Sequence, residues 1–274
     1  MTSLDDNRLV RAFAALRAAG KKTVVPFITA GYPDLETTAA LLGEFARRGV
    51  RVCELGIPFS DPVADGPVIQ ASYTQALETG ITSDRIFETV KRFRQDNSGG
   101  ELALVAMVSY SIVFRHGVDK YLAAARDAGL DGLIIPDLPL EEAGCVEAAA
   151  ADAGLCNILL IAPTTSPRRR LEIARHSRGF IYYVSVAGIT GARDRLPEAT
   201  VAAVAELRKC TDTPVCVGFG VSNAVTVEEV CQVADGAIVG SAIVNRITEE
   251  RDKPAARLVG EVGDFVARLL APLR

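Results

Sequence analysis

Short apolar runs rich in β-branched residues alternate with helical stretches along the whole chain, and this alternation constrains the fold more than any other feature. Each run is apolar enough to be buried on both faces, as strands of parallel sheets are. The alternation predicts parallel strands joined by crossover helices. The eight runs predict a closed (β/α)8 TIM barrel of the α/β class: Val24–Ala30, Val52–Ile57, Leu102–Ser109, Gly132–Pro136, Cys156–Ala162, Phe180–Val186, Val215–Gly218 and Gly236–Val239.

The length of the chain suits one such barrel. It has 274 residues, 49% of them hydrophobic, and barrels commonly reach about 250 residues as one domain. No Ser- or Pro-rich linker interrupts the series, so we expect a single domain over residues 1–274, although two remain possible. Asn97–Gly100 is expected to form a turn at the N-terminal face. Gly188–Pro197 is expected to be a mobile lid, because active sites of barrels lie at the C-terminal ends of the strands.

Capping residues and apolar stripes mark several helices. Caps are expected at Asp34, for a helix ending near Gly49, at Ser83 and Asp84, and at Asn223, for the helix before Ala234. Two extra helices, one near each end of the chain, are expected to cover the ends of the barrel. Their apolar stripes are Leu9, Val10, Phe13 and Leu16, and Leu258, Val262, Phe265 and Leu269.

Charge and residue usage disfavour several classes of function. The net charge of −4 disfavours a nucleic-acid binder, because such binding depends on excess Lys and Arg. Only His116 and His176 are present, which disfavours a histidine-built zinc site or triad and leaves carboxylates as acid–base groups. The cysteines form no C-x-x-C pair and are interpreted as core thiols rather than metal ligands or disulfides: Cys53, Cys145, Cys156, Cys210, Cys216 and Cys231.

The first apolar stretch of the chain is interrupted by charges. Asp5, Asp6, Arg8 and Arg11 leave no uncharged secretory segment, and no run of 18 apolar residues occurs elsewhere. We therefore expect a soluble, cytoplasmic enzyme.

Two carboxyl residues stand out between the second strand and the next helix. Glu54 lies inside the apolar run Val52–Pro58, where an ionised carboxylate without a partner is costly. It is either a structural partner of a basic group or an acid–base residue with a raised pKa. Asp65 follows a proline-rich loop that also holds Asp61, and it is either a turn former or a second catalytic carboxylate returning over the barrel mouth.

Glycines recur after the last three predicted strands, as Gly188 to Gly191, Gly218 to Gly220 and Val239 to Ala242. Each is a weak signal alone, since a tight turn would also use glycine. Together they predict a phosphate site, because glycine lets backbone N–H groups approach an anion and a helix opening at Ser241 would direct its positive end toward it.

Two other polar features allow alternative readings. Arg168–Arg170 follows Pro167 at the start of a helix and is interpreted as a solvated face rather than a binding cluster. Asp137 ends the run Gly132–Pro136 on the catalytic face, where it either lines the pocket or caps the helix beginning near Leu140.

Several motifs together resemble the tryptophan synthase alpha subunit family over nearly the whole chain. The long segment Glu54–Pro67 is specific to that family, whereas the glycine features are shared with many phosphate-binding barrels. The other matching segments are Pro26–Pro33, Pro136–Pro139, Ser185–Gly191 and Gly218–Ser222.

The resemblance implies a lyase of tryptophan biosynthesis that cleaves indole-3-glycerol phosphate to indole and D-glyceraldehyde 3-phosphate by a retro-aldol reaction, without a metal or organic cofactor. It implies that Glu54 is the acid–base residue and that Asp65 stabilises the positively charged indole nitrogen. By the same resemblance Thr190 bonds to Asp65 when the lid closes. The implied substrate-binding positions are Phe27, Asp137, Tyr182, Thr190, Gly191, Gly220, Gly240 and Ser241.

The resemblance also implies a partner, a pyridoxal-phosphate beta subunit in an α2β2 heterotetramer, which alone would carry that cofactor. The loop Pro58–Pro62, with Pro58 and Asp61, and the segment after Ser111 are the implied contact elements. The chain departs from the family at Ser109, where a pocket tyrosine is usual, and at Ser111, where asparagine is usual. Tyr110 is expected to point away from the pocket, offset by one position on a strand.

Two alternative functions remain at this stage. The glycine features alone would fit another phosphate-binding barrel enzyme, such as an isomerase or prenyltransferase, which the Glu54–Pro67 segment disfavours. A mainly allosteric, non-catalytic subunit that activates the beta subunit is disfavoured by the presence of both Glu54 and Asp65.

Overall fold

The strands form one parallel sheet that closes on itself. The computed structural model describes residues 4–63, 65–96, 100–185, 197–218 and 220–273. Within this part of the chain the strand order is β5-β4-β3-β2-β1-β9-β8-β7-β6, and all pairs are parallel. The strands are β1 (Thr23–Thr29), β2 (Val52–Gly56), β3 (Ala103–Met107), β4 (Gly132–Ile134), β5 (Cys156–Ile158), β6 (Leu160–Ile161), β7 (Ile181–Val184), β8 (Val215–Gly218) and β9 (Gly236–Val239).

The barrel is closed by two short strands that the sequence predicted as one. β5 pairs with β4 and β6 pairs with β7, and only Leu159 separates them in the chain. The Leu159 N–H bonds to Ser177 Oγ at 3.1 Å, and its carbonyl accepts from Tyr182 N at 3.0 Å. The chain thus changes its strand partner at Leu159. The predicted eight-position barrel is confirmed, with its fifth position divided into β5 and β6.

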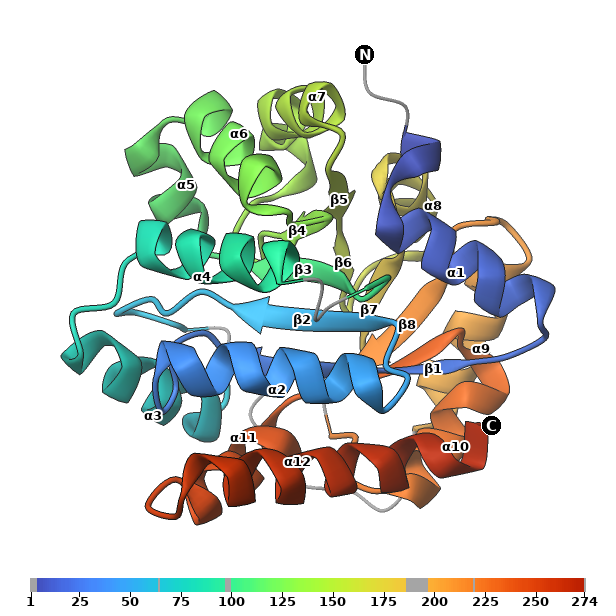
Figure 1. The fold of residues 1–274 in the computed structure, drawn as a ribbon. Helices are drawn as coiled ribbons and strands as arrows, with labels where there is room; N and C mark the ends of the chain where they lie inside the picture. Colours follow the sequence, from blue (N-terminus) through green and yellow to red (C-terminus); the bar gives the residue numbers. More distant parts are fainter. Residues whose placement is uncertain (1–3, 64, 97–99, 186–196, 219, 274) are drawn as a thin grey trace.

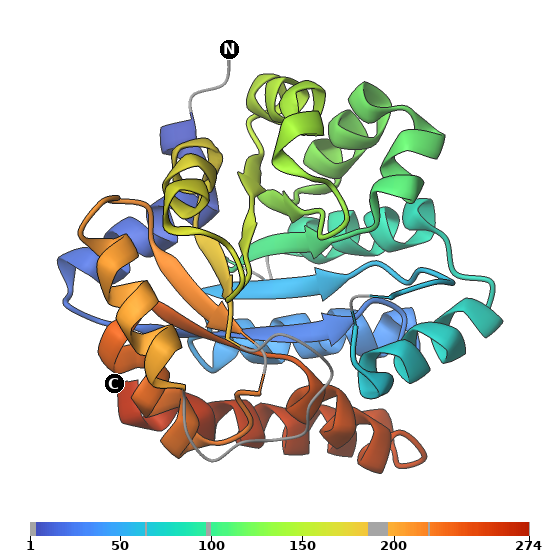
Figure 2. The same ribbon diagram turned by 180° about the vertical axis from the view of Figure 1, so that it is seen from behind.

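Helices surround the barrel, and buried aliphatic side chains fill the space between them and the sheet (Figures 1 and 2). The helices are α1 (Arg8–Ala18), α2 (Leu35–Arg47), α3 (Pro67–Glu78), α4 (Ser83–Gln95), α5 (Tyr110–His116), α6 (Val118–Ala128), α7 (Gly144–Ala153), α8 (Pro167–His176), α9 (Glu198–Arg208), α10 (Ala224–Val233), α11 (Ser241–Glu250) and α12 (Ala255–Leu270), with short 3-10 turns at Leu4–Asp6, Leu140–Glu142 and Ala271–Leu273. None of the helices in the described ranges has the length and apolar character needed to cross a membrane.

Side-chain caps fix the starts of several helices. Asp34 Oδ1 accepts from Thr37 N at 2.6 Å to open α2, and Asn223 accepts from Thr226 N at 3.0 Å to open α10, so both predicted caps are confirmed. The prediction for α4 was off by one residue. Thr82, not Ser83 or Asp84, accepts the bond from Arg85 N, because its extended backbone aims the hydroxyl at the first turn.

The two terminal helices occupy different places. α1 lies across the N-terminal ends of the strands, at the opposite end of the barrel from α3 and α5 (Figure 1). There Asn7 Nδ2 donates to the Asp131 and Gly154 carbonyls, and Arg8 pairs with the buried Asp131 carboxylate at 3.0 Å. The prediction for the last helix was wrong: α12 packs along the flank against α2 and α11, because its apolar stripe covers these helices.

The cysteine prediction is confirmed for four residues and wrong for two. Cys53, Cys156, Cys216 and Cys231 are buried thiols, whereas Cys145 and Cys210 are exposed. Cys145 lies in the first turn of α7 and Cys210 follows the end of α9, whereas Cys53, Cys156 and Cys216 lie on strands and Cys231 lies on the buried face of α10.

Candidate active site

Glu54 lies in the middle of β2, flanked in register by Phe27 of β1 and Val105 of β3. Its side chain is 1% exposed, and Oε2 has no hydrogen-bond partner within the described part of the chain. Burial, reinforced by the negative charge of Asp65, raises the pKa of Glu54 to about 8. Among the described residues no basic side chain forms an ion pair with Glu54, so this part of the chain does not supply the structural partner considered from the sequence.

Asp65 lies just before α3, which begins after Gly66 with Pro67 in its first turn. The Gln70 side-chain amide donates to the carbonyls of Pro62 at 3.2 Å and Asp65 at 2.8 Å, so the helix itself holds the returning loop. Burial raises the pKa of Asp65 to about 6. The fold therefore brings the two carboxyls within electrostatic reach of each other at the C-terminal mouth of the barrel.

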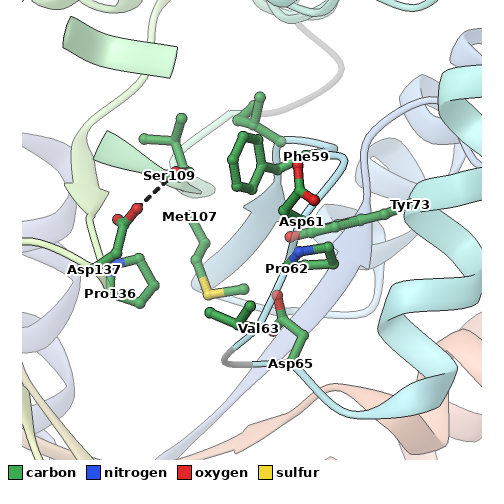
Figure 3. Close-up of a pocket in the computed structure, with 12 residues that line it drawn as sticks. Phe59, Asp61, Pro62, Val63, Asp65, Tyr73, Met107, Ser109, Pro136 and Asp137 are labelled. Atoms are coloured by element: carbon green, nitrogen blue, oxygen red, sulfur yellow. Dashed lines mark hydrogen bonds between the residues drawn. The ribbon is translucent and has the colours of Figure 1, made fainter. Parts of the chain in front are cut away.

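An open pocket lies beside Asp65 at this mouth (Figure 3). Its walls come from three places: the loop after β2 with α3, the end of β3, and the end of β4. The lining is mostly apolar, with carboxylates at its edges, which suits an aromatic ligand with a polar group. The lining residues are Ile57, Phe59, Asp61, Pro62, Val63, Asp65, Tyr73, Met107, Val108, Ser109, Pro136 and Asp137.

Asp137 lines the pocket and also caps a helix. Its carboxylate accepts from Ser109 Oγ at 2.7 Å and from Tyr110 N at 2.8 Å, and so joins the ends of β3 and β4 (Figure 3). The capped helix is α5, not the turn near Leu140, which has no side-chain cap. The two roles that the sequence left open are thus combined, on a different helix from the one expected.

Tyr110 does not line the pocket, as predicted, but the reason differs from the one expected. β3 ends at Met107 and Tyr110 is the first residue of α5, with Ser109 as its cap, so strand alternation does not apply. The Tyr110 ring instead packs against the Phe114 ring, and the two ring centroids are 5.9 Å apart. Ser111 follows on the same exposed helix.

Two aromatic side chains approach the glycines that end two strands. Phe27 is 2% and Tyr182 6% exposed. A Cβ on Gly56 would lie 2.5 Å from Phe27 Cζ, and one on Gly218 would lie 2.4 Å from Tyr182 Oη. Glycine is required at both positions because the ring atoms occupy the space of a side chain.

The described part of the predicted phosphate site lies at the ends of the paired strands β8 and β9. Gly220 has a φ of 82°, Gly240 caps α11, and α11 begins at Ser241 as predicted. Because α11 begins directly after β9, its N-terminal turn lies at the C-terminal end of the strands, where an anion site of this kind is expected. Thr190, Gly191 and the expected lid lie outside the described residues.

The remaining predicted residues differ in exposure. Pro58 is buried at the root of the loop after β2, while Asp61 is exposed and accepts from Ser60 Oγ at 2.5 Å. Arg168 is exposed as expected. Arg170 is not solvated as predicted: it is half-buried, its guanidinium lies 6.0 Å from the centre of the Tyr183 ring, and its Nη2 donates to the Pro163 carbonyl at 3.3 Å.

Sequence reasoning missed Tyr73 and Phe59, which both line the pocket. Tyr73 belongs to the buried stripe of α3 with Ile69, Ser72 and Ala76, so its spacing indicates an ordinary core residue. Phe59 lies within the Glu54–Pro67 segment but was not singled out. Over the described ranges, no three His, Cys, Asp or Glu side chains gather as a metal site would require.

The strands form a closed parallel barrel. Its C-terminal mouth holds a buried glutamate, a second carboxyl and a helix N-terminus preceded by glycine. These features define a (β/α)8-barrel enzyme whose candidate acid–base groups are carboxyls. The sequence profile of the family described as tryptophan synthase alpha chain matches residues 13–265. This chain therefore belongs to the tryptophan synthase alpha chain family.

Individual relatives agree with this assignment. The chain is 42% identical to a tryptophan synthase alpha chain from Rhodopirellula baltica, with 92% of this chain and 94% of the relative covered. It is 44% identical to one from Synechocystis, with coverage of 89% and 91%. Among solved structures, tryptophan synthase subunit alpha from Legionella pneumophila superposes with a TM-score of 0.88 at 34% identity, covering 97% and 98% of the two chains. A tryptophan synthase chain from M. tuberculosis superposes with a TM-score of 0.85 at 30% identity, covering 98% and 100%.

Proposed function

We propose that this chain is the lyase that cleaves indole-3-glycerol phosphate to indole and D-glyceraldehyde 3-phosphate in tryptophan biosynthesis, acting as one (β/α)8 domain over residues 1–274. The observation that carries the proposal is the buried carboxyl of Glu54, whose Oε2 has no hydrogen-bond partner among the described residues and which lies within electrostatic reach of Asp65. Membership of the tryptophan synthase alpha chain family supports the substrate.

Glu54 is the acid–base residue of the proposed reaction. With its pKa raised to about 8, the carboxyl is protonated at neutral pH and can donate to indole C3. The same group then accepts the proton of the glyceryl hydroxyl as the carbon–carbon bond breaks. The electrons of that bond return to the ring, indole leaves, and the hydroxyl carbon becomes the aldehyde. Glu54 ends in the protonation state in which it began.

Asp65 stabilises the positive charge that protonation of C3 places on the indole nitrogen. A carboxylate needs to be ionised for this role, and the Asp65 pKa of about 6 leaves most of it ionised at neutral pH while that of Glu54 is still protonated. The two environments thus separate a proton donor from a fixed anion. Thr190 is assigned the bond to Asp65 in the closed site.

The other binding roles follow from position. Phe27 lies in register with Glu54 and Tyr182 lies within its electrostatic reach, so both are assigned to the substrate site, while Asp137 borders the pocket on the β4 side. The substrate phosphate is assigned to the backbone N–H groups of Gly191, Gly220, Gly240 and Ser241. This chemistry moves protons only, so two carboxyls suffice and no cofactor is assigned to this chain. We place the enzyme in the cytoplasm.

A beta subunit carrying pyridoxal phosphate is the proposed partner, in an α2β2 heterotetramer. The M. tuberculosis structure that this chain resembles is titled a tryptophan synthase. On this chain the loop Pro58–Pro62 and helix α5 flank the pocket. Beside them lie two of the most exposed large apolar side chains of the described residues, Val63 at 85% and Phe114 at 69% exposed. Apolar side chains in such positions favour a protein contact.

Loss of activity in Glu54→Gln tests the proposed function. The chain contains no Trp, so release of indole can be followed by fluorescence without background. We expect the wild type to release indole and glyceraldehyde 3-phosphate in equal amounts, and Glu54→Gln to lose at least roughly a hundredfold in kcat, with KM changed little. Glu88→Gln, on the surface of α4, is the control and should keep full activity. A Glu54→Gln enzyme with the wild-type rate would overturn the mechanism.

A further inference from the structure

Tyr73 enters the pocket from α3, on the same side as Asp65 (Figure 3). The residue is 3% exposed, yet its hydroxyl end points into the pocket. A Cβ on Gly56 would lie 2.6 Å from Tyr73 Oη, so the hydroxyl rests directly on the backbone at the end of β2. The phenol thus reaches the mouth of the barrel itself.

The Tyr73 hydroxyl faces both carboxyls of the site. Gly56 follows Glu54 by two positions on β2, so both residues face the same side of the sheet, about 7 Å apart along the strand. Burial raises the pKa of Tyr73 well above its ordinary value, and the charges of Asp65 and then Glu54 raise it further. The hydroxyl therefore stays protonated and is a permanent donor.

No hydrogen bond joins this hydroxyl to any other described residue, although buried hydroxyls are rarely left unpaired. It lies at the edge of an open pocket, so its partner is a group that moves there or binds there. Of the two neighbouring carboxyls, Glu54 is protonated at neutral pH, whereas Asp65 is largely ionised. A hydroxyl donates more strongly to an ionised acceptor.

We propose that Tyr73 is a positioning residue of this site, whose hydroxyl donates a hydrogen bond to the Asp65 carboxylate when indole occupies the pocket. The bond holds Asp65 ionised and aimed at the indole nitrogen. The inference rests on the proposed function for the identity of the ligand. Tyr73 makes no contact with a reacting atom, and its effect passes through Asp65.

The test is Tyr73→Phe, which keeps the ring and its packing and removes only the hydroxyl. We expect kcat for indole release at pH 7 to fall about tenfold and the acidic limb of the kcat profile, which reports the enzyme with substrate bound, to move about one unit toward higher pH, because Asp65 loses a donor to its ionised form. The alkaline limb should stay in place. Tyr121→Phe is the matched control: Tyr121 is 2% exposed on α6 and lies outside the residues that line the pocket. It should leave both limbs unchanged.

A second measurement separates this inference from the proposed function. Carbon-13 NMR of labelled aspartate reports the ionisation of Asp65 directly, with indole and glycerol 3-phosphate as non-reacting ligands. We expect the Asp65 midpoint with ligands bound to be higher in Tyr73→Phe than in the wild type. Equal midpoints together with equal pH profiles would overturn the role of Tyr73. If the wild type did not cleave indole-3-glycerol phosphate but the Asp65 midpoint still differed between the wild type and Tyr73→Phe, only the proposed function would be overturned.

Discussion

The raised pKa of Glu54 destabilises the folded chain at every pH where the unfolded chain would ionise this carboxyl, and this gives a prediction at the scale of one residue. Its pKa is raised from 4.5 to about 8 on folding. Between these values the folded state holds a proton that the unfolded state releases, so the free energy of unfolding falls as pH rises through this window. Below pH 4.5 both states are protonated and the destabilisation is absent.

Glu54→Gln should therefore be more stable than the wild type at pH 8 and nearly equal to it at pH 4. The difference at pH 8 is expected to approach ~4 kcal/mol, because one pKa unit corresponds to about 1.4 kcal/mol and Glu54 is fully buried. Urea unfolding at several pH values measures it. The free energy of unfolding of Glu88→Gln should depend on pH as that of the wild type does. If the free energy of unfolding of Glu54→Gln also had the wild-type pH dependence, the Glu54 carboxyl would not be held protonated by burial.

The same two carboxyls predict a bell-shaped pH profile for the wild type. Cleavage requires Asp65 ionised and Glu54 protonated, so kcat/KM should rise through about pH 6 and fall through about pH 8. Because the groups interact, the two midpoints belong to the pair. Initial rates of indole release in buffers of constant ionic strength give the curve. An activity that keeps rising above pH 9 would contradict the assignment of Glu54 as the proton donor.

Single residues differ in how far the sequence reveals them. Glu54 was recognisable as a candidate because a carboxyl inside an apolar strand is unusual. The sequence alone shows both the carboxyl and the apolar residues around it. Asp65 was ambiguous until its loop was seen to return over the mouth. Tyr73 was not recognisable, because the helical stripe of α3 gives a core residue and a pocket residue the same spacing.

At the scale of elements, the loop after β8 carries a sharp prediction for the phosphate site. Gly220 has a φ of 82° and open space where a Cβ would point. Gly220→Ala adds only backbone strain, which typically costs about 1 kcal/mol. Gly220→Asp adds the same strain and a negative charge beside the expected phosphate. We expect KM for indole-3-glycerol phosphate to rise severalfold in Gly220→Ala and to become unmeasurably high in Gly220→Asp. Similar KM values in the two variants would place the phosphate elsewhere.

Element order was predictable from the sequence, but local breaks were not. The eight apolar runs gave the barrel, since burial on both faces is visible in composition. The break at Leu159 depends on hydrogen bonds to Ser177 and Tyr182, which lie 18 or more positions away. The placement of Tyr110 on α5 depends on Asp137, which caps that helix from the next strand. Such long-range contacts override local pattern.

At the scale of the whole molecule, the two ends of the barrel have separate tasks. The N-terminal end is held by a buried ion-pair cluster, in which Asp131 bonds to Arg8, to Arg94 at 2.9 Å and to the Leu104 N–H at 2.8 Å. At the C-terminal end, by contrast, Glu54 Oε2 is buried without a hydrogen-bond partner among the described residues, and exposed apolar groups lie around the pocket. Stability is concentrated at one end, and chemistry and partner contact at the other.

This division predicts that a substitution can abolish activation of the chain by the beta subunit while cleavage by the isolated chain is kept. Phe114 lies on α5, outside the residues that line the pocket, and is 69% exposed. Phe114→Asp should leave cleavage by the isolated chain within about twofold, because it removes little buried surface. It should weaken binding to the beta subunit by about a hundredfold or more, since an apolar contact would be replaced by a desolvated charge.

Titration of the chain with a pyridoxal-phosphate beta subunit, following both binding and the rate of indole release, measures this effect. Val225→Asp is the matched control, because Val225 is 63% exposed but lies on α10, away from α5 (Figure 1). It should bind and respond like the wild type. If Phe114→Asp were activated at wild-type concentrations of beta subunit, α5 would not be a docking element, and the loop Pro58–Pro62 would have to form the contact without it.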